Sequence, residues 1–175
     1  MLPPLNFQRW IDEHRHLLKP PVASCDVYAP GDFFVLVIGG PNRRNDFHVG
    51  PGEELYYQVE GEADILYLDA EGRRQVAHLG PGDMWLLPAW VPHRPQRKPN
   101  SVGLVVERKR RADELDRFAW HCERCGLLLH EVKLHLAEME NLMKPMMESF
   151  YANEELRTCK RCGAVLPEPK PYGVP

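Results

Sequence analysis

Two histidines and two adjacent glutamates stand beside glycine- and proline-rich turns. His48 precedes a Gly-Pro-Gly turn, Glu53 and Glu54 follow it, and His93 comes after a later turn of the same kind. A histidine before such a turn and a carboxylate that opens the next strand can converge on one point inside a barrel. A second histidine from a later strand would complete a facial set of two histidines and one carboxylate. That set suits non-haem Fe(II), because three coordination positions stay open for a substrate and dioxygen.

Four of the five cysteines form a second candidate metal site near the C-terminus. They make two Cys-x-x-Cys pairs, each followed by glycine: Cys122, Cys125, Cys159 and Cys162. This duplication is typical of a closed tetrathiolate site that holds zinc or a rubredoxin-like iron. Such a site has no open coordination position, so the expected role is structural. Cys25 stands alone and is expected to be an ordinary small apolar residue.

The elements that must position these residues are predicted mainly as strands. Glycine- and proline-rich turns, including one predicted at 95–101, separate six short apolar runs. The six runs are residues 33–38, 54–60, 63–68, 74–78, 84–87 and 102–107. Short strands without intervening helices indicate a β-barrel or sandwich. A helix is predicted at 6–18, with Asn6 as its N-cap, and another at 137–151, interrupted by Pro145.

Composition limits the classes of function. The chain has 175 residues, a net charge of −3 and 43% hydrophobic residues, which favours one globular domain with an appendage. No apolar run approaches the ~20 residues that cross a bilayer, and the first residues do not resemble a secretory signal. The basic run at 108–111 is followed by acidic residues and is interpreted as a solvated surface. We therefore expect a cytoplasmic protein that binds neither nucleic acid nor membrane.

The segments around the two histidines resemble the paired motifs of the cupin superfamily, a small double-stranded β-helix barrel. The first motif has a glutamate, six further residues and then a glycine, which Glu54 and Gly61 match and Glu53 does not. In the second motif a proline precedes the histidine by five residues, as Pro88 precedes His93. The resemblance implies an Fe(II) ligand set of two histidines and one glutamate: His48, Glu54 and His93.

Longer stretches resemble one family, the 3-hydroxyanthranilate 3,4-dioxygenases. These stretches are LNFQRWIDEH, GGPNRRNDFH, EELYYQ and LLPAWVPHRPQR, and the cysteine-bearing tail is similar to that of the bacterial members. The resemblance implies an extradiol-type, Fe(II)-dependent dioxygenase that opens the ring of 3-hydroxyanthranilate with both atoms of O2. The product, 2-amino-3-carboxymuconate semialdehyde, would cyclise to quinolinate for NAD biosynthesis in the kynurenine pathway. A homodimer is also implied.

The same resemblance implies roles for four further residues. Arg44 and Arg97 would bind the substrate, and Arg44 would also contact the bound oxygen. Glu107 would act on the substrate hydroxyl proton, and Asp46 would support the site from behind. These residue types fit the chemistry, because arginine binds a carboxylate with two hydrogen bonds and a nearby carboxylate can accept a proton.

The resulting expectation is a cupin barrel with an N-terminal helix at 1–117. A rubredoxin-like or zinc-ribbon-like metal subdomain that contains helix would follow at 118–175. Two alternatives are a non-catalytic metal-binding cupin and another cupin enzyme, such as a sugar isomerase or a thiol dioxygenase. Those enzymes are expected to keep one more histidine, or a sugar-binding lysine, in the first motif, where this chain has Gly50. Mere metal storage would need neither arginine nor Glu107.

Overall fold

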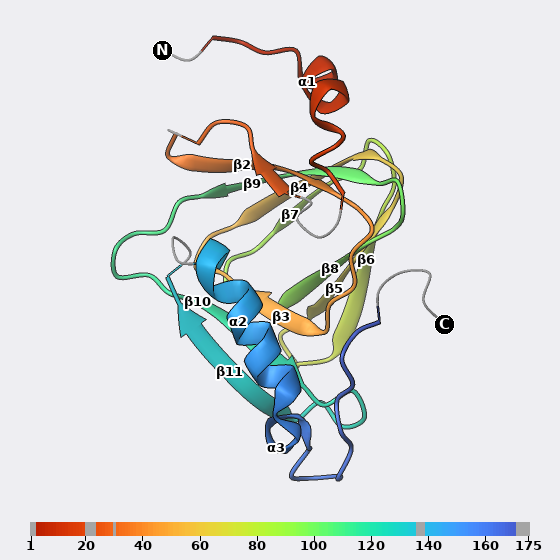
Figure 1. Cartoon of the computed structure of the whole chain (residues 1–175), viewed down its shortest axis with the longest axis vertical. Helices are drawn as coiled ribbons and strands as arrows, with labels where there is room; N and C mark the ends of the chain where they lie inside the picture. The colour runs from red at the N-terminus through yellow and green to blue at the C-terminus, as the bar shows by residue number, and fades with distance from the viewer. Residues whose placement is uncertain (1–2, 20–23, 30, 136–138, 171–175) are drawn as a thin grey trace.

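Two antiparallel sheets face each other in the computed structural model, which describes residues 3–19, 24–29, 31–135 and 139–170 (Figure 1). The first sheet has the order β1 (Ser24–Asp26), β2 (Phe33–Gly39), β9 (Val102–Arg108), β4 (Glu54–Glu60) and β7 (Met84–Leu87). The second has the order β11 (Leu128–Leu134), β10 (Asp116–His121), β3 (Asp46–Val49), β8 (His93–Arg97), β5 (Ala63–Leu68) and β6 (Arg74–Leu79). The predicted all-β core with a cupin-type barrel is confirmed.

The space between the sheets is filled by alternate residues of their strands. Along β4 the side chains alternate between buried and half-buried, as expected when one face of a strand packs on a core. The buried apolar cluster there includes Tyr56, Ile65, Leu87 and Val105. One end of this interior is polar and contains His48, Glu54 and His93, which are also buried.

Two strands that carry candidate site residues, β3 and β8, were not among the predicted strands. The prediction that 95–101 forms a turn is wrong for its first residues, because β8 extends to Arg97. Pro95 lies within β8 and pairs with Ile65 of β5. The other neighbour, β3, pairs with β8 only through His48 and His93. Beyond that pair β8 resembles an edge strand, a position in which proline is tolerated.

The helices differ from their predictions at the ends. The first helix, α1 (Phe7–His14), begins directly after the predicted N-cap, because the Asn6 side chain accepts a hydrogen bond from the Arg9 backbone N–H at 2.9 Å. It ends at His14, before the predicted end at residue 18. The second, α2 (Met139–Ala152), runs through Pro145 without the predicted interruption, and residues 137 and 138 lie outside the described part. A short α3 (Glu154–Arg157) follows.

The cysteine-bearing tail continues the second sheet. Figure 1 shows α2 alongside β10 and β11, and Phe150 of α2 packs with Trp120 of β10 and Leu134 of β11 in one apolar cluster. This packing explains why α2 continues past Pro145. Because β10 crosses residue 117 and pairs with β3, the predicted division at 117/118 falls inside a strand, and that division stays a prediction. None of the described helices is long and apolar enough to span a membrane.

Candidate active site

Three buried side chains meet at the polar end of the barrel. His48 comes from β3, Glu54 opens β4 and His93 opens β8, so the two facing sheets both contribute. The distance from Glu54 Oε1 to His48 Nδ1 is 3.3 Å, and that from Glu54 Oε2 to His93 Nε2 is 3.2 Å. Glu53, the other glutamate considered in the sequence, is exposed. The structure thus brings together the three residues that the cupin resemblance implied.

The spacing of these atoms fits a single metal ion. Ligand atoms about 2.1 Å from one ion and at right angles to each other would lie about 3.0 Å apart, close to the two measured separations. The His93 Nδ1 atom lies 3.0 Å from the Val91 carbonyl oxygen. A hydrogen bond from Nδ1–H to that oxygen leaves the Nε2 lone pair directed at Glu54, as a metal ligand requires.

His48 is oriented by a partner that the sequence did not indicate. Its Nε2 atom lies 2.7 Å from Asp116 Oδ1 on β10, so Nε2–H donates to Asp116 and Nδ1 faces Glu54. Asp116 is fully buried and also accepts hydrogen bonds from Arg110 at 2.8 and 2.9 Å. A carboxylate behind a ligating histidine fixes the ring and raises its basicity. No pattern in the sequence links Asp116 to His48, because the contact depends on β10 pairing with β3.

Tyr56 was also missed, although its position carried a signal. The Tyr56 hydroxyl donates to Glu54 Oε2 at 2.9 Å and so fixes the carboxylate. Residues two apart on a strand share a face, so this alternation could have indicated that Tyr56 lies beside Glu54. Burial raises the pKa of Tyr56 well above its usual value, which keeps the hydroxyl protonated as a donor.

The electrostatics of the three residues favour a bound cation. Burial alone would raise the pKa of Glu54, but the charge and hydrogen bonds of His93 and His48 hold it well below its usual value. Burial lowers the pKa of His48, yet hydrogen bonds to Asp116 and Glu54 outweigh this and raise it to about 9. Surroundings that hold a proton so firmly on a histidine also attract a divalent cation at the same place.

The glycine at position 50 leaves room for a different residue. A Cβ atom built on Gly50 would lie 2.9 Å from Arg110 Nη2 and 3.3 Å from Glu54 Oε1. The Arg110 guanidinium therefore occupies the direction in which many cupins would project their additional histidine. A side chain at position 50 would meet Arg110, and the glycine there contributes no candidate ligand.

The basic run at 108–111 was interpreted wrongly as a solvated surface. The Arg110 side chain is fully buried, and it bridges Glu107 Oε2 at 2.6 Å and Asp116 Oδ1 at 2.8 Å. Arg108 is half-buried and pairs with Glu114 at 2.6 Å. The acidic residues that follow the run are thus its partners within the fold, because the chain turns back on itself between β9 and β10.

Glu107 lies across the strands from Glu54. The two residues pair between β9 and β4, and Glu107 is buried. Burial, reinforced by the negative charge of Glu54, raises the pKa of Glu107 against the opposing charge of Arg110. A carboxylate with a raised pKa, held in place by an arginine beside a metal site, is suited to accept and return a proton.

Arg97 is a buried cation that forms no ion pair with any residue the structure describes, although the charge of Glu54 acts on it. Its residue is only 4% exposed, and among the described residues its Nε atom has no hydrogen-bond partner. Burial, together with the positive charge of Arg44, lowers its pKa to about 10. A buried and unpaired guanidinium is costly, so this site favours an anionic ligand that supplies the missing partner.

Arg44 is already paired within the protein. Its guanidinium binds the fully buried carboxylate of Asp46, with Nε 3.1 Å from each carboxylate oxygen. The guanidinium also lies over the Phe118 ring, 6.0 Å from its centre. Asp46 therefore holds the Arg44 guanidinium in place, and its supporting role in the reaction stays a prediction. Because Asp46 compensates its charge, Arg44 needs an anionic ligand less than Arg97 does.

The four cysteines form a second cluster, remote in sequence and compact in space. Cys122 Sγ lies 3.6 Å from Cys162 Sγ, and Cys125 Sγ lies 3.5 Å from Cys159 Sγ. Four sulfurs about 2.3 Å from a central ion in a tetrahedron would be about 3.8 Å apart. The cluster therefore fits one tetrahedral metal ion, and zinc and iron both suit four thiolates.

The two cysteine pairs have the same backbone geometry. Gly126 and Gly163 each donate a hydrogen bond at 2.9 Å to the carbonyl of the first cysteine of their pair, with φ values of 74° and 70°. These positive values favour glycine at both places. Burial raises the pKa of Cys159, but hydrogen bonds from the Cys162 and Arg161 backbone N–H groups lower it to about 6. A thiolate favoured in this way is ready to bind metal.

Replacing Cys122 and Cys125 with serine is expected to release one metal ion per chain and to lower Tm by more than about 5 °C. The reason is that binding energy at a structural metal site is folding energy, and 1 kcal/mol corresponds to about 2–4 °C at this chain length. Elemental analysis and calorimetry measure the two effects. Cys25→Ser, outside the cluster, is the matched control. Unchanged Tm after loss of the metal would contradict a structural role.

Comparison of the sequence with known proteins identifies one family. The sequence profile for 3-hydroxyanthranilic acid dioxygenase matches residues 1–151. A 3-hydroxyanthranilate 3,4-dioxygenase of Burkholderia cenocepacia is 49% identical over 94% of this chain and 93% of its own, and one of Bacillus cereus is 44% identical over 93% and 91%. Among solved structures, a Bacillus subtilis oxalate decarboxylase matches 49% of this chain and 24% of its own at 22% identity, with a TM-score of 0.41.

Proposed function

Since this chain belongs to the 3-hydroxyanthranilic acid dioxygenase family, we propose a role in ring cleavage for each residue of its polar site. The chain is a dioxygenase that acts on 3-hydroxyanthranilate and O2. The proposed product is 2-amino-3-carboxymuconate semialdehyde, which would cyclise to quinolinate for NAD biosynthesis. The observation that carries the assignment of roles is the unpaired, buried Arg97 beside a set of two histidines and one glutamate.

His48, Glu54 and His93 are proposed to hold Fe(II). Two neutral imidazoles and one carboxylate provide the facial set that non-haem iron oxygenases use. When bound, Fe(II) would hold the substrate and dioxygen side by side and allow electron density to pass between them. The protein's contribution is to fix the three ligands, through Asp116 behind His48 and Tyr56 behind Glu54.

Arg97 is proposed as the main partner of the substrate carboxylate. A planar guanidinium binds a carboxylate with two parallel hydrogen bonds, and this pair is strong where water is excluded. Arg44, held by Asp46, would lie on the same side and contact the substrate or the bound oxygen. The two arginines would thus orient the ring and offset negative charge that develops during the reaction.

Glu107 is proposed to handle the hydroxyl proton of the substrate. Its raised pKa allows it to take the proton as the substrate binds and to return it later in the reaction. Arg110 holds Glu107 Oε2 at 2.6 Å, which leaves Oε1 for the substrate. The proton therefore has a defined acceptor inside a site from which bulk water is excluded.

Replacing Arg97 with alanine is expected to lower kcat/KM for 3-hydroxyanthranilate by about 10- to 150-fold, equivalent to ~1.5–3 kcal/mol for a lost charged hydrogen bond. Arg44→Ala should have a smaller effect, because Arg44 is already paired with Asp46. The same substitutions should change kcat/KM much less for 2-aminophenol, because this compound lacks the carboxylate. Steady-state kinetics with both compounds measure the discrimination between them.

Two controls sharpen this comparison. Arg97→Lys keeps the charge but loses the planar fork, so it should recover only part of the activity. Arg73→Ala removes an arginine whose side chain is 68% exposed and should change nothing. If both arginine variants discriminate between the two compounds as the wild type does, the carboxylate is bound elsewhere and the assignment fails.

Three further properties are proposed for the whole protein. Iron or zinc would occupy the four-cysteine site, and a protein whose five cysteines, all described, form no disulfide suits the reducing cytoplasm. A homodimer is supported by the exposed apolar side chains of Phe33, at the start of β2, and Leu17, which follows α1. The mass in solution tests it, and a value near 20.2 kDa would contradict it.

A further inference from the structure

The segment that carries Arg44 is held by hydrogen bonds from two sides. This segment, here called the Arg44 loop, comprises residues 42–45 and leads into β3. On the barrel side, the Asn42 side chain accepts from the Arg97 backbone N–H at 2.6 Å, and the Arg44 carbonyl accepts from Gln96 at 2.5 Å. On the other side, Asn45 forms hydrogen bonds to the tail.

Two direct contacts join Asn45 to the tail. Its side-chain amide donates to the carbonyl oxygen of Pro167 at 2.8 Å, and its side-chain oxygen accepts from the hydroxyl of Tyr151 on α2. Pro167 follows the second cysteine pair by five residues, and Tyr151 packs in the apolar cluster of the tail. Both the donor and the acceptor of the Asn45 side chain are therefore used by the tail.

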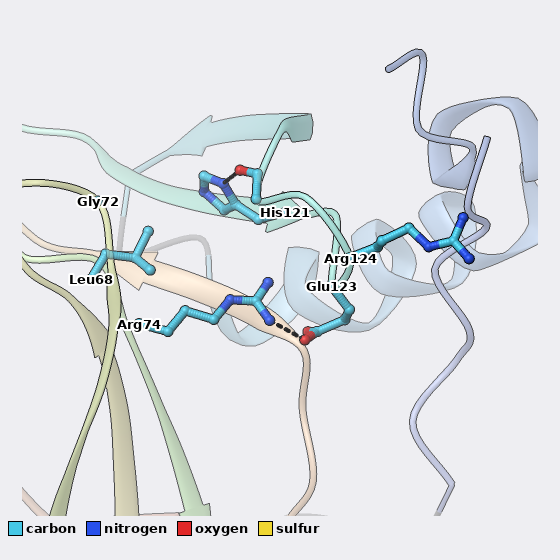
Figure 2. A pocket seen from close by; sticks show the side chains of 7 residues that line it. Leu68, Gly72, Arg74, His121, Glu123 and Arg124 are labelled. Carbon is cyan, nitrogen blue, oxygen red and sulfur yellow. Dashed lines mark hydrogen bonds and ion pairs between the residues drawn. The ribbon is translucent and has the colours of Figure 1, made fainter. Parts of the chain in front are cut away.

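The first cysteine pair reaches Asn45 by a third path. Glu123 lies between Cys122 and Cys125, and it pairs with Arg94 of β8 at 2.8 Å and with Arg74 of β6. Figure 2 shows the Arg74 and Glu123 side chains meeting at the edge of the barrel. Arg94 in turn donates to the Asn45 backbone carbonyl at 3.2 Å. The first and second cysteine pairs thus connect to Asn45 independently.

We propose that Asn45 is a positioning residue through which the four-cysteine unit holds the Arg44 loop in its substrate-binding position. The two cysteine pairs are separated by 33 residues of chain and are fixed relative to each other at their four sulfurs. A metal ion bound there would fix both ends of the connection to Asn45 at once. The tail then contributes to substrate affinity, and not only to stability. This inference rests on the proposed role of Arg44.

The neighbours of Asn45 show why its position matters. Arg44 and Asp46 lie directly before and after it, and they form the ion pair that orients the Arg44 guanidinium. A cavity of about 370 Å³ beside the loop is lined by Arg44, Asn45 and Arg94 and, on the tail side, by Pro167 and Pro169. Because this space is open, the loop would have room to shift if its contacts to the tail were lost.

The test compares variants in the Fe(II)-loaded, full-length protein. Asn45→Ala and the Cys159→Ser/Cys162→Ser double variant are each expected to raise the anaerobic Kd of 3-hydroxyanthranilate about five- to tenfold, the loss typical of one or two hydrogen bonds. kcat should change less than about threefold. Backbone amides of residues 42–46 should exchange hydrogen faster in both variants. Tyr151→Phe keeps the packing and should give a smaller change in the same direction, and Tyr28→Phe and Cys25→Ser are matched controls.

Combining the variants decides between a connection and two separate effects. If the cysteines act through Asn45, the two losses should combine to clearly less than their product, because only the Arg94 contact to the Asn45 backbone carbonyl survives in Asn45→Ala, whereas independent effects would multiply. Multiplying effects, or unchanged Kd in a cysteine variant that has lost its metal, would overturn the inference. Unchanged Kd in Arg44→Ala would instead remove the proposed role of Arg44 and the inference with it. A normal Arg44→Ala defect with unchanged Asn45→Ala binding would overturn the inference alone.

Discussion

Glu54→Ala is expected to lose the catalytic metal and ring cleavage together. The Glu54 carboxylate lies between the two imidazoles, with Oε1 3.3 Å from His48 Nδ1 and Oε2 3.2 Å from His93 Nε2. Removing it takes away the charge that balances a divalent cation and leaves two neutral imidazoles. Loss of a partner outside the ligand set commonly costs 10- to 100-fold in metal affinity, and loss of a ligand should cost more. Anaerobic Fe(II) titration and formation of the yellow product measure the two effects.

The neighbouring glutamate provides the matched control for this prediction. Glu53→Ala removes an exposed carboxylate one residue away and should leave metal binding and turnover unchanged. Glu54→Gln keeps the shape and one oxygen acceptor but loses the charge, so it should lie between the wild type and Glu54→Ala. If Glu54→Ala retained full iron content and activity, the ligand assignment would be wrong and attention would shift to Glu53.

The sequence alone was sufficient to identify the three candidate metal ligands. Glycine and proline beside His48 and His93 mark strand ends, and chemistry that requires two histidines and one carboxylate limits the choice of partners. The cupin motif separated Glu54 from Glu53 by its distance to Gly61. The start of the N-terminal helix was predicted correctly, because Asn6 is a strong capping residue. The end of this helix depends on contacts that the sequence does not display.

Strands β3 and β8 escaped prediction because their residues have weak strand propensity. The β8 sequence is HRPQR, with two arginines and a proline, and β3 has only four residues. Both become strands because their neighbours in the second sheet pair with them, which is a tertiary effect. Strands carrying catalytic residues are where such disagreement is expected, since polar side chains there serve chemistry instead of packing.

The contacts around Arg110 could not be found from local pattern for a related reason. A run of four basic residues is normally solvated, and only the return of the chain from β9 to β10 places Asp116 and Glu107 on either side of Arg110. The same return brings Asp116 to His48. One buried arginine therefore joins the residue proposed for proton transfer to a proposed metal ligand, at a place where Gly50 leaves it room.

Glu107→Gln is expected to lower kcat by about 10²- to 10⁴-fold with little change in Kd for 3-hydroxyanthranilate, because general acid–base help is commonly worth that much and the amide cannot accept the proton. The amide keeps the size of the side chain, so the bridge from Arg110 loses charge but not contact. Single-turnover mixing with O2 separates the chemical step from binding.

Glu60→Gln, which changes a carboxylate paired with Arg15 on the surface, is the matched control and should react normally. A Glu107→Gln protein that kept its kcat but bound substrate more weakly would show that Glu107 contributes to binding alone. The raised pKa of Glu107 would then reflect its burial beside Glu54 and not a role in proton transfer.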